Sequence, residues 1–250
     1  MKILVIGELC EDKFIYCKVE RISPEAPVPV LNPITTVTNL GMAGNVYNNL
    51  KELCPESKID FYHQKKKITK TRFVEQKSNH MFLRYDEGET NIEKFNKKIL
   101  DYKTLKSYDF VVVSDYNKGF LSQDDLYYIS KNSKMSFLDS KKILESKKVK
   151  NFTFIKMNKN ESENNPSIIK NLNVLITLGK DGVKYKKQFY PSPKPQETID
   201  VSGAGDTFIS SFACHYFLYK DVEKSINFAN EVSSEVVSKR GVALPSKKLI

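Results

Sequence analysis

Short apolar runs that alternate with longer stretches of mixed polarity most strongly constrain the fold of this chain. Five runs are typical of buried strands, at residues 3–7, 110–114, 135–139, 153–156 and 174–178. The stretches that favour helices are residues 44–53, 122–131, 157–170, 204–218 and 222–238. Strands that are apolar along their whole length indicate a sheet covered by helices on both faces. The sequence therefore predicts an α/β fold with a mostly parallel central sheet flanked by helices.

Two segments break this rhythm and predict a second, smaller sheet. Residues 14–38 hold four prolines among β-forming residues, and residues 69–85 alternate between polar and apolar side chains. Both patterns favour edge strands of an antiparallel sheet. Ligands of open α/β folds bind at the carboxyl ends of the strands, where such a sheet would exclude water. We expect one domain over residues 1–250, with a β lid at about residues 12–40 and 68–88.

The composition excludes several classes of protein. No apolar run approaches the length of a membrane span, and residues 1–7 are too short for a secretory signal. The four cysteines are Cys10, Cys17, Cys54 and Cys214, and none of them forms a close metal-binding or redox pair in the sequence. Free thiols of this kind predict a reducing, cytoplasmic location, and the lack of a membrane span predicts no membrane partner.

The net charge of +10 suggests either a nucleic acid or another anionic partner. Only four of the 40 basic residues are arginines, and the lysines are spread along the whole chain. No recognition motif or clustered basic stripe accompanies them. The pattern favours a solvated lysine-rich surface, predicts no nucleic acid, and leaves room for a small anionic substrate.

A small-residue turn near the C-terminus carries the clearest chemical signal. The residues Asp-Val-Ser-Gly-Ala-Gly-Asp occupy positions 200–206, directly before a predicted helix. Gly203 and Gly205 permit a tight turn, and a helix N-terminus suits an anion. Asp206 could take a proton beside that anion, as phosphoryl transfer to a hydroxyl requires. Alternatively, Asp206 only caps the helix.

Two further loops follow strands; one is polar and the other contains glycines. Asn158 and Glu161 lie three residues apart after the strand at 153–156, where they could organise Mg²⁺ and phosphates or simply cap a helix. Residues 177–182, with Gly179 and Gly182, could pass close to a nucleotide or form a hairpin turn.

Other polar groups are expected at the same end of the sheet. Asp115 and Lys118 follow the strand at 110–114, and Asp139 ends the next one. Each could be an ordinary polar loop, but together they suggest a nucleotide and a phosphorylated substrate meeting above the sheet. Asp12 and Asn45 could bind sugar hydroxyls, although Asn45 could instead be an N-cap.

Two motifs of the chain carry a resemblance to a known family. Residues 201–208 resemble the anion-hole and catalytic-base motif of the ribokinase-like (phosphofructokinase B) sugar kinases. The stretch Arg-Ile-Ser-Pro-Glu-Ala-Pro-Val-Pro-Val at residues 21–30 is similar to one found in D-glycero-β-D-manno-heptose-7-phosphate kinases. Other segments agree in order, so that the resemblance covers nearly the whole chain.

The resemblance implies a function and a fold. It implies a ribokinase-like fold and an enzyme that transfers the γ-phosphoryl group of ATP to a sugar phosphate. The implied substrate is heptose 7-phosphate, and the implied product is the 1,7-bisphosphate on the route to ADP-heptose. Asp206 would be the base, and the backbone N–H groups of Gly203, Ala204 and Gly205 would stabilise the phosphoryl group. The lid would pair two subunits into a homodimer.

The resemblance also implies binding roles. Glu161 would hold Mg²⁺ through water, and a monovalent cation is a further expected cofactor. The residues expected to contact the nucleotide are Asn158, Thr177, Gly179, Gly182 and Asn230. The residues expected to contact the substrate are Asp12, Gly41, Asn45, Arg72, Arg84, Asp115 and Lys118.

The sequence departs from the family pattern in two places. Met42 follows Gly41 where the family usually has a Gly-Gly pair, so Met42 would narrow or reshape the sugar pocket. Residues 54–63 stand where the family normally carries an extra strand and helix, which leaves the substrate in question. The 250 residues also contain no nucleotidyltransferase domain of the kind that some bifunctional relatives carry, so we expect the kinase unit alone.

Two alternative functions remain open on the sequence. One is a kinase of the same family that acts on another sugar or on a nucleoside. The other is a catalytically idle relative that binds a sugar phosphate or a partner protein. The intact segment from Gly203 to Asp206 argues against the idle relative, because a protein without chemistry has no need of that base.

Overall fold

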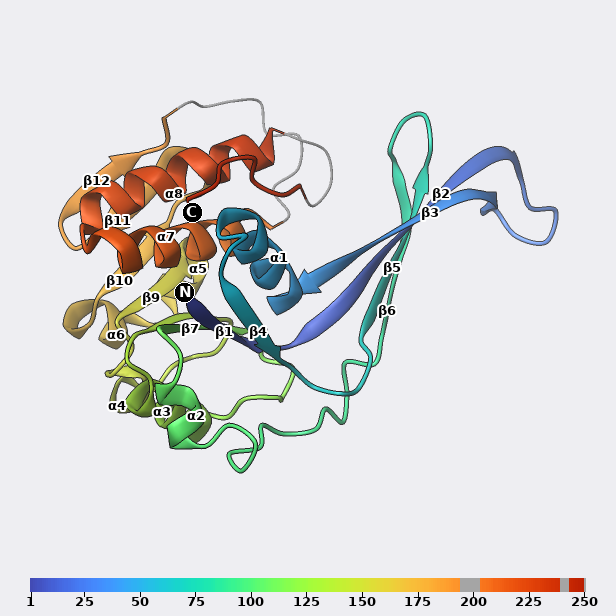
Figure 1. The fold of residues 1–250 in the computed structure, drawn as a ribbon. Helices are drawn as coiled ribbons and strands as arrows, with labels where there is room; N and C mark the ends of the chain where they lie inside the picture. Colours follow the sequence, from blue (N-terminus) through green and yellow to red (C-terminus); the bar gives the residue numbers. More distant parts are fainter. Residues whose placement is uncertain (194–202, 239–242, 250) are drawn as a thin grey trace.

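Two β-sheets organise the part of the chain that the computed structural model describes, namely residues 1–193, 203–238 and 243–249 (Figure 1). The larger sheet has eight strands in the order β12-β11-β10-β9-β8-β7-β1-β4, and the smaller sheet has four in the order β3-β2-β5-β6. In Figure 1 the helices gather around the larger sheet, while the smaller sheet extends away from it.

The larger sheet is mostly parallel, as the sequence predicts. Its strands are β1 (Lys2–Gly7), β4 (Lys58–Tyr62), β7 (Phe110–Asp115), β8 (Ser136–Ser140), β9 (Phe154–Asn158), β10 (Val174–Thr177), β11 (Gly182–Tyr185) and β12 (Gln188–Pro191). The six strands from β4 to β10 in the sheet order run parallel, and β11 and β12 add an antiparallel edge. The carboxyl ends of the parallel strands therefore meet along one side of the sheet.

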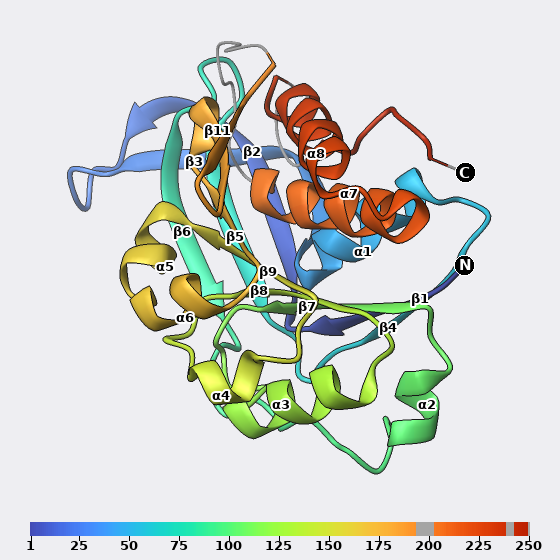
Figure 2. The same ribbon diagram turned by 90° about the vertical axis from the view of Figure 1, so that its left-hand side faces the viewer.

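Helices cover both faces of this sheet (Figure 2). One face packs against α1 (Ala43–Leu53), α7 (Ala204–Tyr219) and α8 (Val222–Val237), and the other against α2 (Tyr102–Lys106), α3 (Gln123–Asn132), α4 (Ser146–Val149) and α6 (Pro166–Asn171). Alternate residues of each strand serve the two cores, because successive side chains point to opposite faces. Ile3 and Val5 belong to the first core, while Leu4 and Ile6 belong to the second. The three-layer α/β architecture is thus confirmed.

Aromatic packing fixes α7 on the sheet. The ring of Phe212 meets that of Phe154 edge-on at 4.9 Å between centroids, and Tyr216 meets the same ring at 4.8 Å. Phe137 of β8 contacts both helix residues. A continuous run from Asp206 to Cys214 is buried. The position of the first turn of α7 therefore depends on the packing of the turns that follow it.

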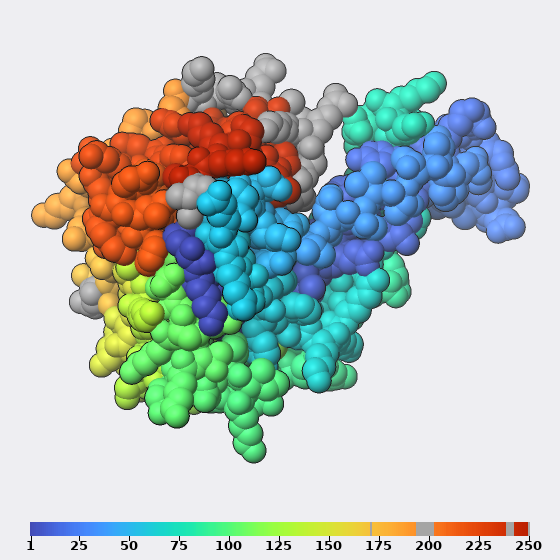
Figure 3. Space-filling model, viewed as in Figure 1, coloured from blue at the N-terminus to red at the C-terminus, as the bar shows by residue number. Residues whose placement is uncertain are grey.

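The smaller sheet is built from β2 (Leu9–Ile22), β3 (Pro29–Met42), β5 (Thr69–Glu75) and β6 (Met81–Glu87). The pairs β2–β3 and β5–β6 are antiparallel, while β2 and β5 run parallel. Figure 3 shows this sheet projecting from the side of the body. The predicted separate sheet is confirmed, and its strands extend a few residues beyond the predicted lid boundaries.

Several elements differ from the sequence-based expectations, among them the short helices α2 and α4, which were not expected. The short segment at 54–63 still forms a strand, β4, which lies parallel to β1 at the sheet edge. The helical stretch expected up to residue 170 is two helices, α5 (Lys159–Glu163) and α6, because Pro166 cannot continue a helix and instead starts a new one. The β11–β12 hairpin was not predicted. Among the described residues, no helix is long and apolar enough to cross a membrane.

The aromatic packing of α7 yields a stability prediction. We expect Phe212→Ala to lower the free energy of unfolding by about 3–5 kcal/mol, because it removes a fully buried ring and leaves a cavity. Urea unfolding followed by circular dichroism measures this. Phe189→Ala is the matched control: Phe189 is 54% exposed, and we expect a far smaller loss. Equal losses of unfolding free energy in the two variants would contradict the role of aromatic packing in holding α7 on the sheet.

Candidate functional site

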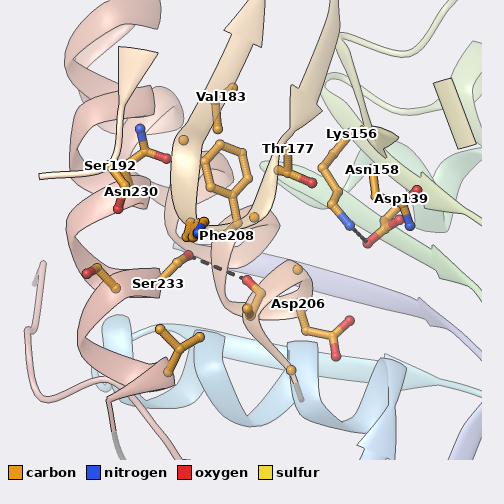
Figure 4. A pocket seen from close by; sticks show the side chains of 18 of the residues that line it. Asp139, Lys156, Asn158, Thr177, Val183, Ser192, Asp206, Phe208, Asn230 and Ser233 are labelled. Atoms are coloured by element: carbon orange, nitrogen blue, oxygen red, sulfur yellow. Dashed lines mark hydrogen bonds and ion pairs between the residues drawn. The ribbon is translucent and has the colours of Figure 1, made fainter. Parts of the chain in front are cut away.

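A cavity of about 510 Å³ lies where the carboxyl ends of β8, β9 and β10 face the N-terminus of α7 (Figure 4). Parallel strands bring residues distant in the sequence to this edge. The lining residues include Tyr116, Asp139, Lys156, Asn158, Thr177, Gly179, Gly182, Gly203, Ala204, Gly205, Asp206 and Asn230. The structure therefore brings together the expected catalytic turn and the expected nucleotide-binding residues.

Asp206 lies on the first turn of α7 and is only 5% exposed. Its carboxylate accepts a hydrogen bond from Asn45 Nδ2 at 3.0 Å and from Tyr116 Oη at 3.0 Å and 3.2 Å. The N-cap of α7 is Gly203, with no side-chain cap. The interpretation of Asp206 as a mere helix cap is therefore wrong, because other elements hold its carboxylate.

The surroundings of Asp206 adjust its acidity. Burial raises the pKa of Asp206 to about 6, and the nearby Asp139 carboxylate adds to the rise. Hydrogen bonds from Asn45 and Tyr116 and the charge of Lys156 oppose it. A base with a pKa slightly below neutral pH is charged at pH 7 and still accepts a proton readily. The electrostatics of the site therefore suit general-base chemistry.

The turn before Asp206 leaves backbone N–H groups free at the head of a 16-residue helix. Gly203 has a φ of 83°, a left-handed conformation that glycine adopts without strain. Partial positive charge at this helix end favours a bound anion. Asp200, Val201 and Ser202, which belong to the same motif, lie outside the described residues.

Asn158 and Glu161 form a capping box at the start of α5. The Asn158 side chain accepts from the Glu161 N–H at 2.9 Å, and Glu161 accepts from the Asn158 N–H at 2.7 Å. Lys141 also pairs with Glu161. The helix-capping interpretation is thus confirmed, although Asn158 lines the cavity as well. Because both carboxylate oxygens of Glu161 already accept hydrogen bonds, this residue fits contact with Mg²⁺ through water.

The turn at residues 177–182 fits the hairpin interpretation and also borders the cavity. A single 3₁₀ turn, Gly179–Asp181, joins β10 to the antiparallel β11, so the segment is a hairpin turn. Thr177, Gly179 and Gly182 nevertheless line the cavity. Opposite them, Asn230 of α8 donates to the Tyr190 carbonyl at 3.1 Å. The described residues contain no cluster of three or more His, Cys, Asp or Glu side chains that could hold a metal alone.

The expected sugar ligands gather where the smaller sheet meets α1. Asp12 of β2 accepts from Arg72 Nη1 at 2.5 Å. A Cβ atom on Gly41 would lie 2.0 Å from Asp12 Oδ2, so the absence of a side chain at position 41 makes room for this carboxylate. Asn45 lies inside α1 and the N-cap is Met42, so the N-cap interpretation of Asn45 is wrong. Its side chain instead donates a hydrogen bond to Asp206.

Met42 fills part of the space beside these residues. Its φ of 54° with ψ of −134° is a conformation that non-glycine residues rarely adopt, at a cost of about 1–3 kcal/mol. The side chain is 4% exposed and packs with Cys10 and Ile68, close to Tyr116. Met42 therefore places an apolar group where the backbone geometry would suit glycine.

Three expected substrate ligands are held elsewhere. Asp115 is buried in an ion pair with Lys142 at 2.6 Å, Lys118 pairs with Glu89 at 2.6 Å, and Arg84 pairs with its strand neighbour Asp86. None of the seven expected substrate ligands, Asp12, Gly41, Asn45 and Arg72 included, lines the cavity. Any contact of the three paired groups with a substrate would require those pairs to open.

Some site residues were missed in the sequence. Tyr116 holds Asp206 directly, and the fully buried Glu8 accepts the backbone N–H groups of Tyr116 at 2.8 Å and Lys118 at 3.0 Å. Burial, followed by the charge of Asp115, raises the pKa of Glu8. The signal for Glu8 was a carboxylate placed directly after a buried strand. Glu8 positions the loop that presents Tyr116.

Comparison with known proteins identifies the family. A family model described as pfkB family carbohydrate kinase matches residues 34–249. The bifunctional protein HldE of Helicobacter pylori strain J99 is 30% identical over 302 aligned residues, which cover 98% of this chain and 64% of that protein. The chain thus spans less than two thirds of the length of this relative.

Solved structures share the fold. The ribokinase of Thermotoga maritima matches with a TM-score of 0.75 at 14% identity, covering 98% of this chain and 96% of that one. The ribokinase of Arabidopsis thaliana, solved with ribose and ATP, matches with a TM-score of 0.71 at 14% identity, covering 98% and 95%. The ribokinase-like fold expected from the sequence is confirmed.

The hydrogen bonds around Asp206 yield a titration prediction. We expect Asp206 to be charged above a pH of about 6 and protonated below it. Asn45→Ala should raise this pKa further, because it removes a donor that favours the charged form. Carbon-detected NMR of the Asp206 carboxyl group measures both values. Asn48→Ala on the same helix is the control and should leave the pKa unchanged; a pKa near 4 in the parent protein would refute this description.

Proposed function

The chain belongs to the pfkB family of carbohydrate kinases, and we propose that it transfers the γ-phosphoryl group of ATP to a hydroxyl of a sugar phosphate. The observation that carries the proposal is the buried Asp206 on the first turn of α7. A base and an anion-binding helix N-terminus then share one turn. Phosphoryl transfer depends mainly on such positioning and charge stabilisation.

The proposed reaction uses few protein groups. The acceptor hydroxyl loses its proton to Asp206, its oxygen forms a bond to the γ-phosphorus, and the bond from that phosphorus to the bridging oxygen breaks. The electron pair of the broken bond leaves with ADP. The N–H groups at residues 203–205 offset the negative charge on the phosphoryl oxygens. Asn45 and Tyr116 orient the base.

The cavity suits a nucleoside triphosphate. Its glycine-containing turn at Gly179–Asp181 and the side of α8 around Asn230 offer apolar surface and polar contacts to an adenosine group. Mg²⁺ would be held mainly by phosphate oxygens and water, with Glu161 contacting a coordinated water. When bound, the ion supplies charge neutralisation of the phosphates. The buried oxygen Oδ1 of Asp139, which has no hydrogen-bond partner among the described residues, would be a second acceptor for such water.

We propose heptose 7-phosphate as the acceptor. The similarity to HldE over 98% of the chain and the stretch at residues 21–30 support this choice. Asp12 and Asn45 would bind hydroxyl groups, and Arg72 would contact the phosphate. Met42 favours a second candidate, a kinase for a smaller sugar phosphate, because its buried side chain occupies space beside Tyr116.

We also propose that the smaller sheet is the lid of a single domain and pairs two subunits. Along β6 the side chains of Leu83 and Tyr85 point to one face, since alternate residues of a strand share a face, while a bulge in the pairing with β5 separates them from Met81. Met81, Leu83 and Tyr85 are 50%, 54% and 53% exposed. A row of exposed apolar side chains on a projecting sheet is typical of a protein interface. A second copy of this chain would cover it.

The kinase proposal is tested by ADP release from Mg·ATP with a panel of sugar 7-, 6- and 1-phosphates. We expect turnover with heptose 7-phosphate and formation of the 1,7-bisphosphate. Asp206→Asn should reduce kcat by roughly 10²–10⁴-fold, because the base is lost, while ATP binding stays close to that of the parent protein.

Each outcome of that assay has a defined meaning. Turnover with another sugar phosphate alone would replace the proposed acceptor and retain the kinase. ATP binding without turnover on any acceptor would support the idle relative. Near-normal turnover in Asp206→Asn would overturn the role of Asp206 as the base.

The dimer proposal is tested by light scattering after size exclusion. We expect the parent protein to elute as a dimer and Leu83→Glu to shift it toward the monomer, because the substitution places a charge in the apolar row. Ile143→Glu is the control, since Ile143 is 75% exposed and lies outside the lid. A monomeric parent protein, or an unchanged dimer in Leu83→Glu, would contradict this interface.

A further inference from the structure

Lys156 and Asp139 form a buried ion pair at the edge of the cavity. Lys156 Nζ donates to Asp139 Oδ2 at 2.8 Å, and the two side chains are only 3% and 6% exposed. The residues are direct neighbours on adjacent parallel strands, β9 and β8, so both side chains reach the same side of the sheet. Figure 4 shows the pair beside Thr177, with Asp206 on the facing helix.

Stability alone is a weak reason for such a pair. Removing two charges from water costs several kcal/mol per ion, and apolar side chains of similar volume often serve as well. Lysine is almost never buried without a partner. Charged groups with this burial in a cleft are frequently functional. The pair is therefore a candidate for a chemical role.

Gly205 shows that the ammonium group lies against the first turn of α7. A Cβ atom at position 205 would lie 2.7 Å from Lys156 Nζ and 3.5 Å from Lys156 Cε. Residue 205 is helical, so its backbone conformation does not require glycine. The missing side chain instead makes room for Lys156. The ammonium thus sits beside the N–H groups that would receive the phosphoryl oxygens.

The pair has unused hydrogen-bonding capacity. An ammonium group has three donors, and among the described residues only Asp139 accepts from Lys156. The other oxygen of Asp139 is buried and has no partner within the described part of the chain. Buried polar atoms are usually satisfied, so this one calls for an explanation. A bound ligand would supply the missing partners.

We propose that Lys156 is a further catalytic residue, which binds an oxygen of the transferring γ-phosphoryl group from the side of β9. Asp139 holds the ammonium at the first turn of α7. Lys156 takes no part in the proton transfer, because the hydroxyl proton goes to Asp206, and its side-chain nitrogen binds a phosphoryl oxygen as the bond to ADP breaks. This inference rests on the proposed kinase function and adds a residue to it.

Nucleotide binding distinguishes a catalytic role of Lys156 from a structural one. Titration calorimetry of Lys156→Met with Mg·ADP and with the non-hydrolysable analogue Mg·AMP-PNP compares ligands that differ by one phosphoryl group. We expect AMP-PNP affinity to fall roughly tenfold and ADP affinity to stay unchanged, with kcat reduced by about 10²–10³-fold, as for other lost oxyanion donors. Equal losses for both nucleotides, or a parental kcat, would overturn the proposal.

The matched variants cover the case in which Lys156→Met destabilises the fold. Asp139→Asn keeps the ammonium and should keep the AMP-PNP preference, with a smaller loss of kcat. The double variant Lys156→Met, Asp139→Leu removes both buried charges and should fold. If its transfer rate stays low, the result supports a catalytic Lys156; if the parental rate returns, Lys156 is only structural.

The parent protein distinguishes the two proposals. If it binds both nucleotides and transfers phosphate while the variants do not discriminate between ADP and AMP-PNP, only the role of Lys156 fails. If the parent protein binds neither nucleotide, the kinase proposal fails and the role of Lys156 falls with it.

Discussion

The packing of α7 against the central sheet is the interaction on which the site depends. Phe212 and Tyr216 press against Phe154 and Phe137, and this contact holds the first turn of the helix above the strand ends. Asp206 can stay buried only because Asn45 and Tyr116, from other elements, meet it there. A small rotation of α7 would break both hydrogen bonds and leave an unpaired carboxyl group in the core.

The fold was largely predictable because its signals are local. Apolar runs such as residues 110–114 identify buried strands without any knowledge of their partners, and the prolines of residues 14–38 mark an unusual sheet. The missed strand β4 is partly exposed and borders only β1, so its sequence lacks a continuous apolar run. The β11–β12 hairpin follows a short turn whose sequence is equally typical of a loop.

The site was predictable where one residue carries its own chemistry and was missed where the chemistry belongs to a pair. Asp206 stands out in its motif, but nothing in the sequence connects it to Tyr116, ninety positions earlier. Lys156 and Asp139 read as ordinary strand ends until the sheet register makes them neighbours. Asn158 belongs to a capping box and Gly179 to a hairpin turn, and both also line the cavity, so these structural roles do not exclude the proposed contact with a nucleotide.

The position of β1 in the sheet has a consequence for synthesis. Strand β1 lies between β4 and β7, so one of its two partners begins more than a hundred residues later in the chain. Parallel pairing across such a separation is slow, because the intervening chain must be ordered first. Until Phe110–Asp115 is made, the apolar strand Lys2–Gly7 has at most one neighbour. During synthesis this strand therefore has an unpaired edge that only the later strand β7 covers.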